Sequence, residues 1–326
     1  MEHITDLDEI RKLADSGNAE AQNKLGDMYK DGDGVKQNDK KAVRYFSMAA
    51  AQGDRKGEYN MGWMCHRGRG MKQDDKETFE WYKKAAEKGE VFAQCNLGFM
   101  YSEGTGVEQD HKKALKWFKL AAENGDSMAY HNIGIMYSNG EGVKKDDKES
   151  LIWFEKAAEL GYSESQCLLG MMYAQGKDVR KNIRRAFKWY SAAAEQGDII
   201  AQFYTAVMYN TGQGVDQNHE EAARWYRTAA EQGDQDAQCC LGRMYASGEG
   251  VDENFEEAFK WFKMSADQKN PEAQYCLGLM YESGNGVKRS YSKSMKYYRL
   301  AAEQGDENAK TELHRKKLEK MVPKGL

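Results

Sequence analysis

The apolar residues of this chain recur with a period of 36 residues. Tyrosine follows methionine seven times, always 36 residues or twice that apart: Met28-Tyr29, Met100-Tyr101, Met136-Tyr137, Met172-Tyr173, Met208-Tyr209, Met244-Tyr245 and Met280-Tyr281. The second unit has Met64-Cys65 in this place. Eight units therefore begin at residues 19, 55, 91, 127, 163, 199, 235 and 271, and a shortened ninth copy begins at residue 307. A fixed period of this length is typical of repeat architectures.

The first half of each unit has the hydrophobic pattern of an amphipathic helix. In the third unit Ala93, Leu97, Met100 and Tyr101 are spaced i, i+4, i+7 and i+8, which predicts one apolar helix face. Counted from the first residue of each unit, these are positions 3, 7, 10 and 11. Position 8 is glycine in seven of the eight units, which predicts that a neighbouring backbone approaches the helix there.

The second half of each unit carries the start signals of another helix. Position 20 is always a short polar residue of the kind that caps helix N-termini: Asn38, Asp74, Asp110, Asp146, Asn182, Asn218, Asn254 and Ser290. It follows a loop with recurring glycines, which suit helix termination and positive φ. In the third unit the second helix then buries Ala114, Trp117, Phe118, Ala121 and Ala122. The aromatic residue at position 27, mostly tryptophan, is assigned to the core.

One such helix pair cannot bury its own apolar face, whereas stacked pairs bury a continuous core. The predicted fold is therefore all-α, a right-handed α-α solenoid of tandem helix-turn-helix repeats. We expect an N-terminal capping helix within residues 1–18, eight repeats over residues 19–306, and a C-terminal capping helix and tail over residues 307–326. In this last segment Lys316 and Lys317 stand where methionine and tyrosine would pack, as expected at an end on which nothing stacks.

Composition and charge narrow the possible functions. The chain has 326 residues, 40% of them hydrophobic, which suffices for a large core. Acidic and basic residues are mixed and the net charge is −4, so we expect no nucleic-acid partner. No apolar run has the length of a membrane span, and the first residues do not resemble a signal peptide. We therefore expect a cytoplasmic protein whose six cysteines are free thiols.

Three motifs resemble parts of a catalytic site, a zinc site or a phosphate-binding loop, but none is complete enough to predict that site. Residues 290–293 match the S-x-x-K motif of penicillin-recognising enzymes, but Ser290 is also the helix cap at position 20. Cys65 and His66 are adjacent but lack further ligands at zinc spacing. The loop glycines are not followed by the lysine of a phosphate-binding loop. We therefore predict no metal ion, no cofactor and no enzymatic activity.

The whole unit resembles the Sel1-like repeat, a relative of the tetratricopeptide repeat. The shared motif is Ala-x-x-x-Leu-Gly-x-Met-Tyr-x-x-Gly-x-Gly-Val, followed by Asp/Asn-x-x-x-Ala-x-x-Trp-Phe/Tyr-x-x-Ala-Ala-x-x-Gly-Asp, and it extends over about residues 7–320. Thr205-Ala206 in place of Leu-Gly and Lys269 in place of the closing glycine are local departures. The resemblance implies a protein-binding solenoid, of a family that serves as adaptors in signalling, quality control and host–microbe contact.

Some cysteine-rich Sel1-like proteins are linked to β-lactam binding, and they carry a regular cysteine pair in each repeat. The cysteines of this chain fall at positions 5, 6 and 11 of different units, so they form no such pair. A β-lactam-interacting enzyme is therefore the weakest of the alternatives.

One stripe of the first helix is more apolar than expected for a surface that only faces solvent. It comprises positions 2, 5, 9 and 12, which lie outside the predicted core face. The stripe is polar in the first and seventh units and apolar between them. Its candidate partner-binding residues are Tyr59, Trp63, Phe92, Phe99, Met128, Ile135, Met171, Ile200, Phe203 and Val207, and it also contains Cys95, His131 and Cys167.

Two interpretations of this stripe remain open. If its side chains are exposed, they line a concave groove that binds a peptide or helix of another protein, or they form the face of a homodimer. If they are buried, they pack between neighbouring first helices. The pattern favours the groove, and with it a scaffold or adaptor function.

Overall fold

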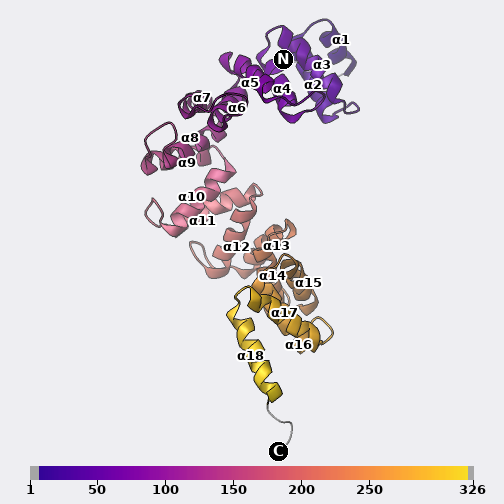
Figure 1. Ribbon diagram of the computed structural model, residues 1–326, viewed down its shortest axis with the longest axis vertical. Helices are drawn as coiled ribbons and strands as arrows, with labels where there is room; N and C mark the ends of the chain where they lie inside the picture. The colour runs from indigo at the N-terminus through magenta and orange to yellow at the C-terminus, as the bar shows by residue number, and fades with distance from the viewer. Residues whose placement is uncertain (1–6, 322–326) are drawn as a thin grey trace, which may run out of the picture. The chain divides into compact units, whose positions relative to one another are not determined.

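The computed structural model describes residues 7–321 and the side chains of residues 7–318. Within this range the chain forms 18 helices and no strand (Figure 1), so the predicted all-α repeat fold is confirmed. Residues 1–6 and 322–326, which belong to the two predicted end segments, lie outside the described residues. The chain divides into two compact units, Met1–Tyr162 and Ser163–Leu326, and each is described by itself.

Even-numbered helices from α2 to α16 are the first helices of the repeats, and odd-numbered helices from α3 to α17 are the second helices. Unit 1 contains α1 (Leu7–Asp15), α2 (Ala19–Asp31), α3 (Asp39–Ala51), α4 (Arg55–Arg67), α5 (Asp75–Glu87), α6 (Val91–Glu103), α7 (His111–Glu123), α8 (Ser127–Asn139) and α9 (Asp147–Glu159). Unit 2 contains α10 (Ser163–Gln175), α11 (Ile183–Glu195), α12 (Ile199–Thr211), α13 (His219–Glu231), α14 (Gln235–Ser247), α15 (Phe255–Asp267), α16 (Pro271–Ser283), α17 (Tyr291–Glu303) and α18 (Glu307–Met321).

The helix boundaries follow from capping residues. All eight predicted caps at position 20 accept a hydrogen bond from a backbone N–H of the helix that they start, as Asp110 does from Lys113 over 3.0 Å. First helices end at a glycine in the left-handed conformation, such as Gly104 at φ 71°. Asp178 and Lys269 adopt the same conformation without being glycine, at φ 62° and 71°. The loops therefore keep their geometry where the sequence departs from the repeat.

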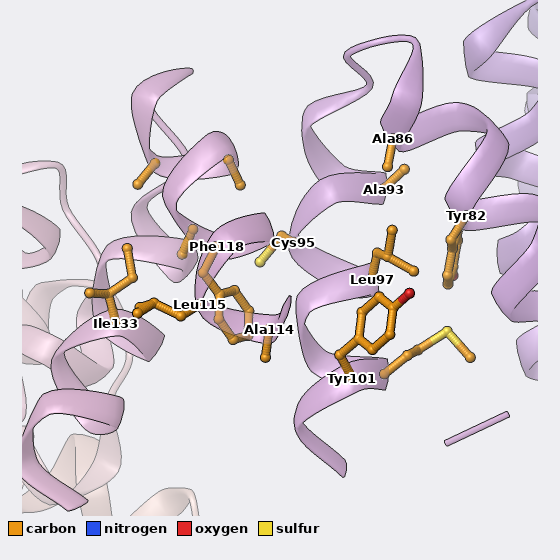
Figure 2. Close-up of a cluster of buried hydrophobic side chains, with 14 of the residues drawn as sticks. Tyr82, Ala86, Ala93, Cys95, Leu97, Tyr101, Ala114, Leu115, Phe118 and Ile133 are labelled. Atoms are coloured by element: carbon orange, nitrogen blue, oxygen red, sulfur yellow. The ribbon is translucent and has the colours of Figure 1, made fainter. Parts of the chain in front are cut away.

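The glycine at position 8 makes room for an aromatic ring. A Cβ atom added to Gly98 would lie 2.7 Å from a ring carbon of Phe118, a fully buried residue of the same repeat (Figure 2). The same pairing with the ring at position 28 recurs in all seven units that have this glycine. The prediction that a neighbouring backbone approaches position 8 was therefore wrong. The aromatic residue at position 28 is buried in all eight repeats, whereas the one at position 27 is buried only at Trp189 and Trp225 and half-buried elsewhere.

A backbone contact does occur, but at the glycine of position 16. A Cβ atom on Gly106 would lie 2.1 Å from the carbonyl oxygen of Asp75, at the start of the second helix of the preceding repeat. The equivalent distances lie between 2.0 and 2.6 Å for Gly70, Gly142, Gly214, Gly250 and Gly286. Because a Cβ atom at these six glycines would overlap the carbonyl oxygen, they let consecutive repeats approach at the level of the backbone.

Buried side-chain amides form a second link between helices. The Gln238 Nε2 atom donates to the carbonyl of Ala230 over 3.0 Å, and the Gln268 Nε2 atom donates to the Gln238 Oε1 atom over 3.0 Å. In repeat two the same two positions hold the ion pair of Glu58 and Lys88, 2.7 Å apart. These bonds join the first helix of a repeat to the second helices on both sides and satisfy its buried polar groups.

The last described helix, α18, contains a paired cation. Lys316 is buried and forms an ion pair with Glu282 of α16, so it is not simply exposed to solvent. No described helix combines the length and the apolar character that crossing a membrane requires.

The contact at position 16 leads to a stability prediction with a built-in control. Gly106 and Gly125 both have positive φ, but no atom lies within 4 Å of a Cβ atom added to Gly125. We expect Gly125→Ala to lower the free energy of unfolding by about 1–2 kcal/mol, the cost of the left-handed conformation. Gly106→Ala should cost clearly more, because its methyl group also meets the Asp75 carbonyl. Chemical denaturation measures both values, and equal losses would contradict the proposed backbone contact.

Candidate functional site

The first helices present one face outward from the core. Residues at position 2 are exposed in all eight repeats, and residues at position 9 are exposed or half-buried. These positions lie on the same side of the helix because seven residues make nearly two turns. Position 6 borders the same side. The residues at positions 2, 6 and 9 are called the first-helix face below.

In unit 1 the first-helix face carries two large exposed apolar side chains. Phe92 is 59% exposed and Met128 is 39% exposed. The Phe92 ring lies 6.0 Å from the ring of Tyr59, which stacks on Tyr82 at 5.8 Å. Phe99 is half-buried and packs edge-on against Phe118, with ring centroids 5.3 Å apart. Phe92 and Met128 therefore form the open part of this face, while Tyr59 and Phe99 connect it to the core.

Trp63, another predicted site residue, is covered by cations. The Lys30 ammonium and the Arg69 guanidinium each lie 5.3 Å from its ring centroid. Arg69 is held in place by two bonds to the Asp39 carboxylate, of 2.6 and 3.1 Å, and this guanidinium lowers the pKa of Asp39. The Trp63 ring is thus part of a cation–aromatic cluster and is less open than Phe92.

In unit 2 the most exposed apolar residues of this face are Ile200, Tyr204 and Leu279. Tyr204 stacks on Tyr190 with ring centroids 5.0 Å apart. Among the other predicted site residues, Ile135 in unit 1 and Met171, Phe203 and Val207 in unit 2 are half-buried. Sequence reasoning missed Tyr204 and Leu279. Including position 6 and the eighth repeat in the stripe would have found both.

Position 5 belongs mostly to the core. Cys95 and Cys167, which the sequence pattern included in the stripe, are buried. His131 is half-buried between the rings of Phe154 and Tyr162, at centroid distances of 5.4 and 5.0 Å. At these positions, packing between helices describes the structure better than a groove.

Large exposed apolar residues also occur on the second helices or directly after them, but they share no position. They are Ile152, Leu160, Met264 and Tyr291, at positions 26, 34, 30 and 21. By contrast, three of the five on first helices, Phe92, Met128 and Ile200, share position 2. Scattered surface apolar residues are ordinary, whereas a shared repeat position places these three on the same side of their own first helices.

Unit 2 also contains a pocket of about 460 Å³ between α14 and α16. Phe262 of α15 and Met244 and Met280 of the flanking helices supply apolar lining, and Leu279 of the first-helix face lines it as well. Arg243 also lines the pocket and donates to the Glu272 carboxylate over 2.6 Å. A cavity of this size can take a small ligand or a few side chains of a peptide.

The pocket also contains two thiols, Cys240 and Cys276. Burial raises the pKa of Cys240 to about 11 and that of Cys276 to about 12, so both remain protonated at neutral pH. A protonated thiol is a poor nucleophile and a poor metal ligand. Among the described residues, no three or more His, Cys, Asp or Glu side chains are grouped so that they could hold a metal ion.

The fold defines a helical-repeat protein, an architecture that is typically a non-enzymatic scaffold. The family model described as the Sel1 repeat matches residues 19–54, 55–90, 91–126, 127–162, 163–198, 199–234, 235–270 and 271–306. The chain therefore belongs to the Sel1 repeat family. Proteins of this family generally mediate protein–protein interactions.

Two solved structures of similar proteins support this assignment. A protective antigen of uropathogenic Escherichia coli with an SLR fold is 37% identical, with a TM-score of 0.84 over 95% of this chain and 66% of that protein. The chain thus spans just under two thirds of that relative. A Sel1 repeat protein from Oxalobacter formigenes is 30% identical, with a TM-score of 0.60 over 95% of this chain and 89% of that protein. A comparison with curated protein sequences finds no match.

The state of the cysteines can be tested by alkylation. All six are free thiols in the structure. We expect iodoacetamide to modify all six after unfolding without reductant, and to react slowly with the folded protein at neutral pH, because four are buried and the pKa of Cys240 and of Cys276 is raised. Mass spectrometry counts the modified residues. Fewer than six after unfolding would reveal a disulfide that this structure does not contain.

Proposed function

We propose that this protein is a scaffold or adaptor that binds a segment of another protein on its first-helix face. The observation that carries the proposal is the shared position of Phe92, Met128 and Ile200 at the outward side of three first helices. Protein interfaces are anchored by a few large apolar side chains that lose contact with water on binding. The partner is a protein rather than a nucleic acid or a membrane, and the six free thiols favour a reducing compartment such as the cytoplasm.

The size of the exposed side chains makes such binding energetically reasonable. Burying a fully exposed phenylalanine or isoleucine contributes about 1.5–3 kcal/mol. Phe92 is 59% exposed and Ile200 is 53% exposed, so each can supply a large part of that amount when a partner covers it. The half-buried residues Phe99 and Phe203 are worse anchors, since their rings already pack on Phe118 and Tyr226.

The proposal predicts that charge on the first-helix face abolishes partner capture. Phe92→Asp in unit 1 and Ile200→Asp in unit 2 should fold with nearly unchanged melting temperatures, because both side chains are largely exposed. Each should lose proteins that the tagged wild-type chain captures, as measured by quantitative mass spectrometry.

Leu160→Asp and Met264→Asp are the matched controls. Both residues are exposed to a similar extent as Ile200 and Phe92, but Leu160 follows α9 and Met264 lies on α15, so neither belongs to the first-helix face. The controls should capture the same proteins as the wild type. If all four variants behave alike, the first-helix face is not the binding surface. If the lost protein is a second, untagged copy of this chain, the face is a homodimer interface instead.

A further inference from the structure

We propose that the pocket between α14 and α16 binds a peptide segment in which a bulky apolar side chain stands next to a lysine or arginine. The inference rests on the proposed protein-binding function and specifies the chemistry of the partner at one place on the first-helix face. Leu279 belongs to both the face and the pocket, so a segment on the face continues directly into the pocket.

The shape of the pocket suits a short stretch of extended chain. Its walls run along α14 from Cys240 to Ser247 and along α16 from Cys276 to Ser283. Seven residues of α-helix correspond to roughly 10 Å. An extended peptide advances about 3.3 Å per residue, so about three residues of a partner match this length.

The inner surface of the pocket favours an apolar side chain. Phe262, Met244, Met280 and Leu279 contribute carbon and thioether atoms. The neighbouring thiols add polarisable surface without charge, since burial keeps the pKa of Cys240 well above neutrality. Methionine-rich surfaces adapt to differently shaped apolar side chains. A leucine, phenylalanine or tryptophan of the partner is therefore the expected occupant.

The charges next to the pocket favour a cation beside that apolar residue. Asp236 and Glu272, at position 2 of α14 and α16, precede the pocket-lining residues Cys240 and Cys276 by about one helical turn, and Asp234 caps α14. Glu249 lines the opposite end of the pocket and lies 3.2 Å from His219. The guanidinium of Arg243 offsets only part of this charge, because it is paired with Glu272.

The carboxylates of Asp234, Asp236 and Glu272 already repel one another. The pKa of Asp236 is raised, first by partial burial and then by the negative charges of Asp234 and Glu272, although Asn270 donates a hydrogen bond to it. The charge of Glu272 also raises the pKa of Cys276 inside the pocket. An arriving lysine or arginine relieves this repulsion, whereas an acidic residue adds to it.

Two synthetic peptides test the sign of the partner charge. Both are fluorescent and carry a central Leu-Trp pair, flanked by lysines in one peptide and by glutamates in the other. Fluorescence anisotropy with the full chain should give about tenfold tighter binding of the lysine peptide, and added salt should weaken it. Equal affinities, tighter binding of the glutamate peptide or no binding of either would each overturn the proposal.

Three variants locate the binding. Glu272→Gln should weaken the lysine peptide by roughly fivefold, whereas Arg243→Gln should tighten it, because Glu272 is then unpaired. Glu164→Gln changes the same repeat position of α10, a helix that contributes no residue to the pocket, and should leave the affinity unchanged. If Arg243→Gln abolishes binding of the lysine peptide, Arg243 contributes to binding instead of competing for Glu272, and the proposal is wrong.

The two functional proposals fail separately. Suppose that Phe92→Asp and Ile200→Asp lose the captured partner but the lysine peptide is not preferred. The scaffold function is then supported, and the assignment of the pocket is wrong. Tight lysine-peptide binding that Glu272→Gln does not change would place the peptide elsewhere on the protein, which also overturns the pocket assignment.

Discussion

Within each unit, a carbonyl oxygen at the start of a second helix lies against a glycine in the loop of the next repeat, as Asp75 does against Gly106. A Cβ atom at these glycines would overlap the oxygen, so consecutive repeats within a unit meet at the level of the backbone. Side chains add a second link through the ladder of glutamines such as Gln238 and Gln268. Since both contacts recur in most repeats with the 36-residue period, most repeats within a unit meet their neighbours in the same way.

This regular stacking fixes which side of each first helix stays outside. Gly98 makes room for the Phe118 ring, and Met100 and Leu97 are buried on the same side of α6. The opposite side is then left for position 2, whatever residue stands there. In some repeats that residue is charged, and in others it is Phe92, Met128 or Ile200. The packing of the core thus creates a face whose chemistry can vary without cost to the fold, which is the property that a binding scaffold needs.

The sequence predicted the helices, the repeat period and the caps well, because each depends on local chemistry that recurs eight times. It was less reliable where a contact spans distant residues. Gly98 was expected to meet a backbone and instead meets the Phe118 ring, since a glycine alone does not reveal its neighbour. Periodicity also assigned Cys95 to the outer stripe. Its small side chain lies at the edge of that stripe and is buried in the core. The pocket beside Arg243 could not be foreseen, because it is formed by residues from five helices and their loops.

Methionine oxidation tests the orientation of the first helices most directly. Met128 and Met136 lie on the same helix, α8, at positions 2 and 10. Met128 is 39% exposed and Met136 is 2% exposed. Under mild hydrogen peroxide, residue-resolved mass spectrometry should find Met128 oxidised much faster than Met136, because oxidation follows exposure of the thioether. Equal rates, or faster oxidation of Met136, would mean that position 2 does not face outward and would contradict the proposed binding face.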